Sequence, residues 1–188
     1  MGDGGALVIK EPELYEKAKK LRWLGIDKDT YKRSVDGDPI HKKYLWKYDV
    51  PYIGYKYHMN DITAAIGVEQ LKYLDKHNAR RLRIMEMYKK AFSSSRKITL
   101  PSYETKRISS YHFYPIFVER REDLIAELKS NDIHPGVHYF RNDHYSPYMQ
   151  ANLPNTDYVT NHEITLPIHL GLTDEDVESV ISCVLGEW

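Results

Sequence analysis

Residues 52–81 read YIGYKYHMNDITAAIGVEQLKYLDKHNARR. Asn60 is a preferred N-cap residue, and apolar residues recur after it at helical spacing as far as Leu74. The small residues Ala64, Ala65 and Gly67 would let another backbone approach this helix closely. A second helical pattern continues from residue 82 to residue 92. The stretch therefore predicts two successive helices entered from a loop rich in tyrosine.

The N-terminal flank, residues 2–26, reads GDGGALVIKEPELYEKAKKLRWLGI. Its glycines indicate a tight turn, and residues 6–9 indicate a short apolar strand. Pro12 suits a first helical turn and Gly25 suits a C-cap, which predicts a helix over 12–24. Residues 26–53 follow as a long irregular segment, whose many aromatic residues argue against disorder.

The last third alternates between the two kinds of secondary structure. Residues 111–118 and 136–140 predict strands, and residues 121–130 predict a helix. The sequence Thr173-Asp174-Glu175-Asp176 resembles a capping box at the start of a final helix. The fold class is therefore α/β, and the second half by itself is typical of a small α+β unit with a few strands covered by helices.

Composition excludes several classes of protein. The 188 residues hold 27 Lys and Arg against 27 Asp and Glu, so the net charge is zero and argues against a general nucleic-acid or membrane-surface binder. No apolar run approaches the roughly 18 residues that a membrane span needs, and no signal pattern opens the chain. Cys183 is the single cysteine, so a reducing cytoplasm is expected and no internal disulfide can form.

Residue chemistry alone identifies no catalytic centre. His134 and His138 are four residues apart, but Pro135 and Gly136 between them forbid the helix that would place both on one face, so no metal is expected. The basic run over 77–90 is typical of a solvated helix face. Nucleophile-elbow, P-loop and HExxH motifs are missing from the sequence.

Four stretches taken together resemble one family. They are residues 2–26, residues 52–81, the segment ELKSNDIHPGVHYF at 127–140 and the segment NHEITLPIHLGLTDEDVESVI at 161–181. Their order and spacing are similar to those of the DegT/DnrJ/EryC1/StrS sugar aminotransferases, and the resemblance covers essentially the whole chain. It implies the C-terminal portion of a fold-type-I transferase that uses pyridoxal 5′-phosphate (PLP).

In that family a lysine precedes the GDGG turn by five residues and forms the Schiff base with PLP. The resemblance therefore implies a catalytic lysine before Met1, no catalytic residue within the chain, and no activity of the chain alone. It also implies three regions. Residues 1–60 would end the PLP-binding large domain, residues 61–95 would be linking helices, and residues 96–188 would form the small C-terminal domain.

The resemblance also implies site residues. Lys56 matches a position that reaches the PLP phosphate of the neighbouring subunit in the dimer, and His58 lies close to it in sequence. His138 and Tyr139 match a His-Tyr pair near the sugar side of the active site. Asn142 and His144, with Arg141, are candidate neighbours of the substrate. From the residues alone, Lys56 is better explained as a surface lysine. The His-Tyr pair could equally be ordinary strand residues with satisfied polar tips.

The implied reaction is amine transfer, with glutamate as donor, to a nucleotide-linked keto-sugar. Its product is an amino sugar for surface polysaccharide or a natural product. The expected assembly is a cytoplasmic homodimer. Two alternatives stay open: one half of a split enzyme that needs an N-terminal partner chain, and a binding or scaffold module that has kept the small-domain fold without catalysis.

Overall fold

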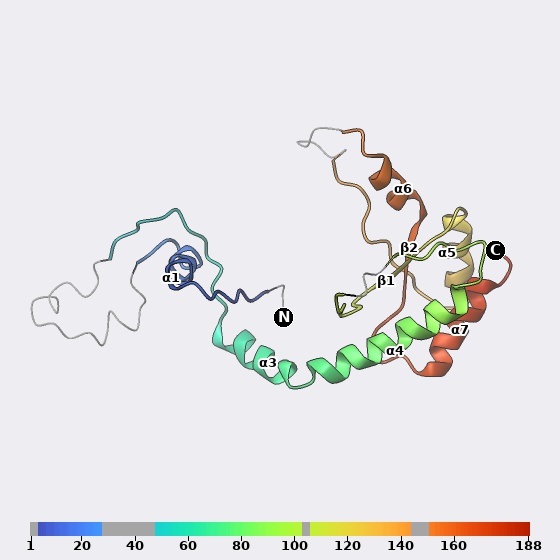
Figure 1. Cartoon of the computed structure of the whole chain (residues 1–188), viewed down its shortest axis with the longest axis horizontal. Coiled ribbons are helices and arrows are strands. Elements are labelled where there is room, and N and C mark those ends of the chain that lie inside the picture. Colours follow the sequence, from blue (N-terminus) through green and yellow to red (C-terminus); the bar gives the residue numbers. More distant parts are fainter. Residues whose placement is uncertain (1–3, 28–47, 103–105, 144–150) are drawn as a thin grey trace, which may run out of the picture. The chain divides into compact units, whose positions relative to one another are not determined.

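The computed structural model describes residues 4–27, 48–102, 106–143 and 151–188 (Figure 1). The chain divides into two compact units, residues 1–71 and residues 72–188. Most of the aromatic segment expected over 26–53, and His144, lie outside the described residues. The three-region division at residues 60 and 95 stays a prediction.

The N-terminal unit contains α1 (Pro12–Leu21) and α3 (Asp61–Leu71). Helix α1 begins at the predicted proline but ends earlier than the predicted residue 24. Beyond it, Leu24 and Gly25 adopt positive φ angles of 58° and 76°. A Cβ on Gly25 would lie 1.7 Å from the carbonyl oxygen of Tyr52, so glycine is required where these two segments meet.

The strand predicted over residues 6–9 is wrong. These residues have no strand conformation, and the side chains of Leu7 and Val8 are 77% and 90% exposed. A strand exists only where a neighbouring backbone completes its hydrogen bonds, and no described residue pairs with this segment.

The N-cap of α3 is confirmed. The side-chain oxygen Oδ1 of Asn60 accepts a hydrogen bond of 2.9 Å from the backbone amide of Thr63. The apolar residues of the helix are spread around its circumference, and none of its residues is buried within the chain. Ile62 and Leu71 are 76% and 67% exposed.

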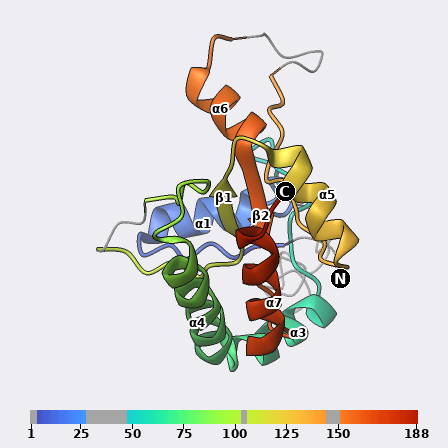
Figure 2. The ribbon, with the colours of Figure 1, turned by 90° about the vertical axis from the view of Figure 1, so that its right-hand side faces the viewer.

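The C-terminal unit is the predicted α+β unit (Figure 2). It contains α4 (Leu74–Phe92), β1 (Tyr114–Phe117), α5 (Arg121–Ser130), α6 (Pro154–His162), β2 (Glu163–Leu166) and α7 (Asp174–Leu185). Helix α4 packs against α7, and α5 packs against α7 and β2. Helix α5 has the predicted bounds, whereas α6 and β2 were not predicted.

The two strands form an antiparallel pair in which Phe117 lies opposite Glu163. The predicted strand over 136–140 is wrong beyond its first residue, because only Gly136 bridges Thr165 of β2. Two residues later the backbone amide of His138 donates to the side chain of Glu163, so it makes no further ladder hydrogen bond with β2. Strand β1 is likewise shorter than the predicted 111–118.

The core of the C-terminal unit lies between the strands and helices α4, α5 and α7. Tyr88 is fully buried there, and its hydroxyl donates a hydrogen bond of 2.8 Å to the carbonyl oxygen of Pro167. Burial, with a smaller contribution from Tyr114, raises the pKa of Tyr88. The other core residues on these elements are Ile84, Met85, Phe92, Tyr114, Ile116, Leu124, Leu128, Ile164, Leu166, Val177, Val180 and Val184.

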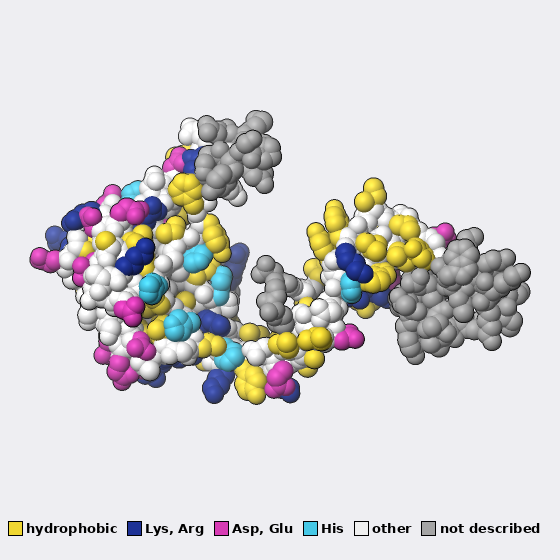
Figure 3. Space-filling view, turned by 180° about the vertical axis from the view of Figure 1, so that it is seen from behind, with side chains coloured by type: hydrophobic (Ala, Val, Ile, Leu, Met, Phe, Trp, Pro, Cys, Tyr) yellow, Lys and Arg dark blue, Asp and Glu magenta, His cyan; other side chains and the backbone are white. Residues whose placement is uncertain are grey.

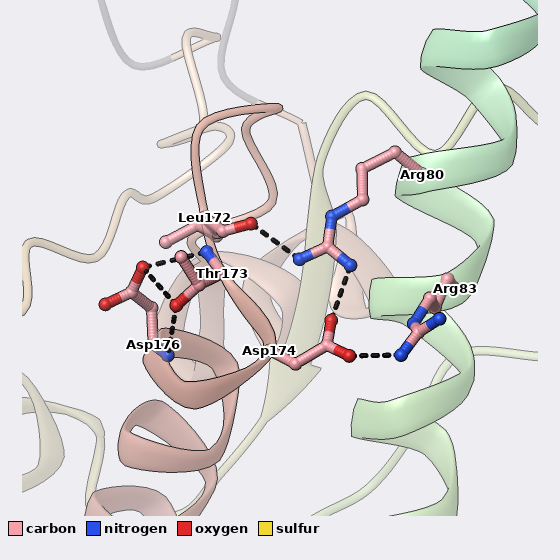
Figure 4. A network of polar contacts seen from close by, with 6 residues as sticks. All are labelled: Arg80, Arg83, Leu172, Thr173, Asp174 and Asp176. Atoms are coloured by element: carbon pink, nitrogen blue, oxygen red, sulfur yellow. Dashed lines mark hydrogen bonds and ion pairs between the residues drawn. The ribbon is translucent and has the colours of Figure 1, made fainter.

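A polar network joins α4 to the start of α7 (Figure 4). Arg80 donates to the carboxylate of Asp174 at 2.6 Å and to the carbonyl oxygen of Leu172, and Arg83 donates to the other oxygen of that carboxylate. The hydrogen bond from Arg80 is the main cause that lowers the pKa of Asp174. The predicted capping box between Thr173 and Asp176 is confirmed.

Candidate functional site

Lys56 is held by the contact between the end of α1 and the segment around residue 55. Backbone hydrogen bonds join Tyr55 to Leu21 and Leu24 at 2.7 and 3.0 Å, and Trp23 forms an antiparallel bridge with Lys56. This pairing places the Lys56 ammonium 3.4 Å from the centre of the Trp23 ring. The side chain is exposed, and no carboxylate among the described residues pairs with it, so its charge is available to an anion.

His58 contacts the same tryptophan. Its ring meets Trp23 edge-on, with 4.3 Å between ring centres. Its Nδ1 atom is buried and has no hydrogen-bond partner among the described residues. A hollow beside these side chains is lined by Gly4, Gly5, Lys56, Tyr57, His58, Met59, Asn60 and Thr63. Lys56, His58 and residues at the first turn of α3 thus line one hollow in the N-terminal unit.

His138 belongs to a buried hydrogen-bond network in the C-terminal unit. Its backbone amide donates to Oε2 of Glu163 at 2.8 Å, and its Nδ1 lies 2.8 Å from the hydroxyl of Thr165. That hydroxyl donates to Oε1 of the same carboxylate. Glu163 is only 2% exposed, so both of its oxygens are satisfied inside the protein rather than by water.

The network determines which nitrogen of His138 carries the hydrogen. The single hydroxyl hydrogen of Thr165 is used on the Glu163 carboxylate, so the Thr165 oxygen can only accept from the ring. Nδ1 of His138 is therefore the donor, and the neutral ring keeps its lone pair on Nε2. His138 consequently offers an acceptor to any ligand beside it.

An open hollow of about 620 Å³ lies beside this network. Tyr139 is 76% exposed, and its ring meets the His138 ring edge-on at 4.8 Å. The Phe113 ring also lies near His138, with 5.8 Å between ring centres. The residues that line the hollow are Arg81, His112, Phe113, His134, Pro135, Gly136, His138, Tyr139, Thr165, Leu166, Pro167, Ile168, His169 and Leu170. The structure thus brings the predicted pair His138 and Tyr139 together at one hollow.

Arg141 has structural partners. Its guanidinium donates to both oxygens of Asp143 at 2.6 and 2.5 Å and also to Asp157. The hydrogen bond from Arg141 holds the pKa of Asp143 far below its usual range. Asn142 is exposed and has no hydrogen-bond partner in the described part of the chain. Neither Arg141 nor Asn142 lines the hollow beside His138, and their contact with a substrate stays a prediction.

Sequence reasoning missed Glu163 and Thr165, which orient His138, and also Arg81, His112 and His169 in the same hollow. The signal that could have found the network was Glu163, the one charged residue in the run EITLPI.

Within residues 4–27, 48–102, 106–143 and 151–188, no three His, Cys, Asp or Glu side chains are placed to hold a metal ion. The same residues include no helix that is both long and apolar enough to cross a membrane.

Comparisons with known proteins agree on one family. The sequence model of the DegT/DnrJ/EryC1/StrS aminotransferase family matches residues 1–185. An uncharacterized protein of Methanocaldococcus jannaschii, MJ1066, is 33% identical over 97% of this chain and 49% of its own length. The sugar aminotransferase CalS13 from Micromonospora echinospora superposes with a TM-score of 0.83 at 26% identity, covering 96% of this chain and 47% of that chain.

Spr1654 from Streptococcus pneumoniae, in its PMP form, superposes with a TM-score of 0.76 at 29% identity, covering 96% of this chain and 46% of that chain.

The class defined by this fold is the C-terminal portion of a fold-type-I, PLP-dependent transferase. The chain belongs to the DegT/DnrJ/EryC1/StrS aminotransferase family. It spans about half the length of the relatives that it matches.

Proposed function

We propose that the chain forms the C-terminal part of an aminotransferase that converts a nucleotide-linked keto-sugar into an amino sugar, with glutamate as the amino donor. The family match over residues 1–185 carries the reaction class. The geometry of His138 supports the sugar half of the proposal, because its Nε2 lone pair offers an acceptor to a ligand. A sugar hydroxyl is a donor of the kind that this nitrogen would bind.

The residues around Lys56 fit the phosphate of PLP. A lysine ammonium without a described carboxylate partner, next to the first turn of a helix, is a favourable place for a phosphate. Bound PLP supplies an electron sink for amine transfer. In this proposal Lys56 neutralises the phosphate, the Trp23 ring holds the lysine side chain in place, and Nδ1 of His58 supplies a further hydrogen bond.

This role of Lys56 is testable by phosphate affinity and by covalent trapping. The chain alone is not expected to bind PLP, so the test uses its complex with the N-terminal half of a relative. PLP should bind this complex more weakly when Lys56→Gln is introduced, and equally well when the exposed Lys10→Gln is introduced. Borohydride reduction of the PLP mixture, followed by peptide mapping, should give no stoichiometric pyridoxyl adduct at Lys56. One such adduct would show that Lys56 acts as a Schiff-base lysine and would contradict the phosphate role.

The chain alone is expected to give no turnover, because it spans about half of the relatives that it matches. The test supplies the purified chain with PLP, glutamate and a panel of nucleotide-linked keto-sugars, alone and together with the N-terminal half of a relative. Amino-sugar formation by the complemented protein supports the proposal. Turnover by the isolated chain would overturn the expected inactivity, and turnover with a keto acid in place of every keto-sugar would overturn the substrate class.

The N-terminal unit exposes several large apolar side chains. Val8, Ile53, Ile62 and Leu71 are 90%, 94%, 76% and 67% exposed, and apolar surface of this extent favours burial against another chain. We propose that a second copy or an N-terminal half covers it. Light scattering distinguishes these partners: a dimer of the isolated chain supports the second copy, and a heterodimer formed only on co-expression supports the split enzyme.

A further inference from the structure

A half-buried cluster of charges is centred on Arg141. Its guanidinium donates to both carboxylate oxygens of Asp143 at 2.6 and 2.5 Å, to Asp157 of α6, and to the carbonyl oxygen of Ala151 at 3.1 Å. The Arg141 side chain is 19% exposed and that of Asp143 is 16% exposed, whereas basic and acidic side chains are also interspersed over the open surface of this unit (Figure 3). The orientation of this guanidinium is therefore fixed by two carboxylates from separate parts of the chain.

The cluster is unsuited to binding an anion. All three guanidinium nitrogens of Arg141 already donate to the protein, and one cation shared by two carboxylates leaves the cluster with a net negative charge. A phosphate or carboxylate of a ligand would have to displace Asp143 or Asp157. Arg141 therefore holds parts of the chain together rather than a ligand.

Tyr139 lies between two attachments of the chain. On one side, the backbone amide of His138 donates to the side chain of Glu163 at the start of β2. On the other side, Arg141 donates to Asp157. Tyr139 itself makes no hydrogen bond within the part of the chain that the structure describes. Its position at the hollow therefore depends on the two neighbouring residues that are attached.

Helix α6, which carries Asp157, is itself fastened to the segment between β1 and α5. The amide of Val118, directly after β1, donates to the carbonyl oxygen of His162 at 3.0 Å. Arg121, at the start of α5, donates to the carbonyl oxygen of Thr160. Because α6 continues directly into β2, the two carboxylates that hold the segment around Tyr139 belong to one supported stretch of chain.

We propose that Arg141 is a positioning residue, which acts through Tyr139 on the sugar substrate by tying Asp143 to α6. The planar guanidinium can serve two carboxylates at fixed angles, whereas a lysine ammonium is a flexible point charge. An arginine is thus the residue that this link requires. The contact of Tyr139 with the sugar rests on the proposed function, whereas the link itself is a feature of the C-terminal unit alone.

Kinetics test this role in the complex of the chain with the N-terminal half of a relative. Arg141→Gln should raise the KM for the nucleotide-linked keto-sugar by about fivefold or more and leave kcat within about twofold, because a displaced Tyr139 weakens sugar binding. A variant that merely unfolds more readily would lose kcat at an unchanged KM. Arg141→Lys should recover little of the loss. An unchanged sugar KM in Arg141→Gln, or full recovery by Arg141→Lys, overturns the proposal.

Asp157→Asn separates positioning from direct contact by the sign of its effect. If Arg141 bound the substrate itself, removing a competing carboxylate would free its guanidinium and lower the sugar KM. In the positioning role the KM rises, and Arg141→Gln adds no further rise to it, since both changes break one link. Arg120→Gln is the matched control, because its ion pair with Asp123 is exposed, and it should leave the KM unchanged. A lower KM in Asp157→Asn, or additive rises in the double variant, overturns the proposal.

The link is also testable in the 188-residue chain without any activity. The Tyr139 ring meets the His138 ring edge-on at 4.8 Å, so its NMR chemical shift depends on how the two rings are oriented. In the chain labelled with carbon-13 at tyrosine, the Tyr139 signal, assigned with Tyr139→Phe, should move in Arg141→Gln and Asp157→Asn and stay in place in Arg120→Gln. Circular dichroism checks that each variant is folded.

This readout separates the proposal from the proposed function. If the Tyr139 signal moves as described but the complemented protein makes no amino sugar, the positioning of Tyr139 by Arg141 stands and the proposed reaction fails. If the complemented protein is active and the Tyr139 signal is the same in Arg141→Gln as in the parent, the reaction stands and the positioning role is wrong.

Discussion

The backbone amide of His138 donates a hydrogen bond of 2.8 Å to the side chain of Glu163, a buried carboxylate twenty-five residues further along the chain. The same carboxylate accepts the hydroxyl of Thr165, which in turn lies against the His138 ring. One side chain therefore sets both the backbone position and the ring tautomer of the histidine in the proposed sugar site.

Glu163→Gln tests this arrangement. When the single acceptor oxygen of the glutamine faces the His138 amide, its NH₂ group donates to the Thr165 hydroxyl, which must then donate to Nδ1 of His138 and so reverses the ring tautomer. We expect the free energy of unfolding to fall by about 1 kcal/mol, because two hydrogen bonds to a charged group are replaced by neutral ones, as measured by urea denaturation. Glu178→Gln, an exposed change on α7, is the control, and equal stability of the two variants would contradict the role given to Glu163.

Gly25→Ala should disrupt the pairing that holds Lys56. The new methyl group would meet the Tyr52 carbonyl at 1.7 Å, and the residue would keep a positive φ of 76° that alanine disfavours. We expect a loss of more than about 2 kcal/mol from the N-terminal unit, seen as faster limited proteolysis. Gly67→Ala is the matched control, since nothing lies within 4 Å of its added Cβ, and it should be neutral or stabilising.

Tyr88→Phe should destabilise the C-terminal unit by about 1 kcal/mol at neutral pH, because the Pro167 carbonyl loses its donor. Folding raises the pKa of Tyr88, so its contribution is present below the unfolded pKa of about 10 and is lost as the pH rises further. As the pH rises above about 10, the free energy of unfolding measured by urea titration should therefore fall less in the variant than in the parent. Tyr57 is 75% exposed, so Tyr57→Phe should leave the pH dependence of the free energy of unfolding above about pH 10 unchanged.

Asp174→Asn should change how the free energy of unfolding depends on pH in the acid range. The hydrogen bonds from Arg80 and Arg83 lower the pKa of Asp174, so its contribution is present above the unfolded pKa of about 3.9 and is lost as the pH falls through the folded pKa. The variant should be less stable than the parent at pH 7, and this difference should shrink toward pH 2 in thermal unfolding. A constant difference across that range would show that the ion pairs with Arg80 and Arg83 contribute nothing.

The helix starts could be predicted from the sequence because a helix start is a local event. Pro12, Asn60 and Thr173 act on backbone groups within the next turn, and each lies where the structure begins a helix. The order of four motifs along the chain also indicated the family, and the family match over residues 1–185 confirms it.

Strands were predicted less well, because a strand depends on a partner distant in sequence. The residues at 6–9 have strand composition but no described neighbour, and the ladder at Gly136 ends where a glutamate side chain takes the next amide. Strand β2 was missed although its residues, Glu-Ile-Thr-Leu, alternate polar and apolar. All four residues are buried, since Glu163 and Thr165 belong to the hydrogen-bond network with His138.

The sequence by itself determined the family, the helix starts and the identity of His138, Tyr139 and Lys56 as candidates. Only the tertiary structure decided how these side chains are used. It placed Lys56 on the ring of Trp23 and buried Glu163 beneath His138. It also grouped Arg81 with four histidines around one hollow. Such contacts join residues far apart in the chain, and their geometry depends on how whole elements pack, which no local pattern specifies.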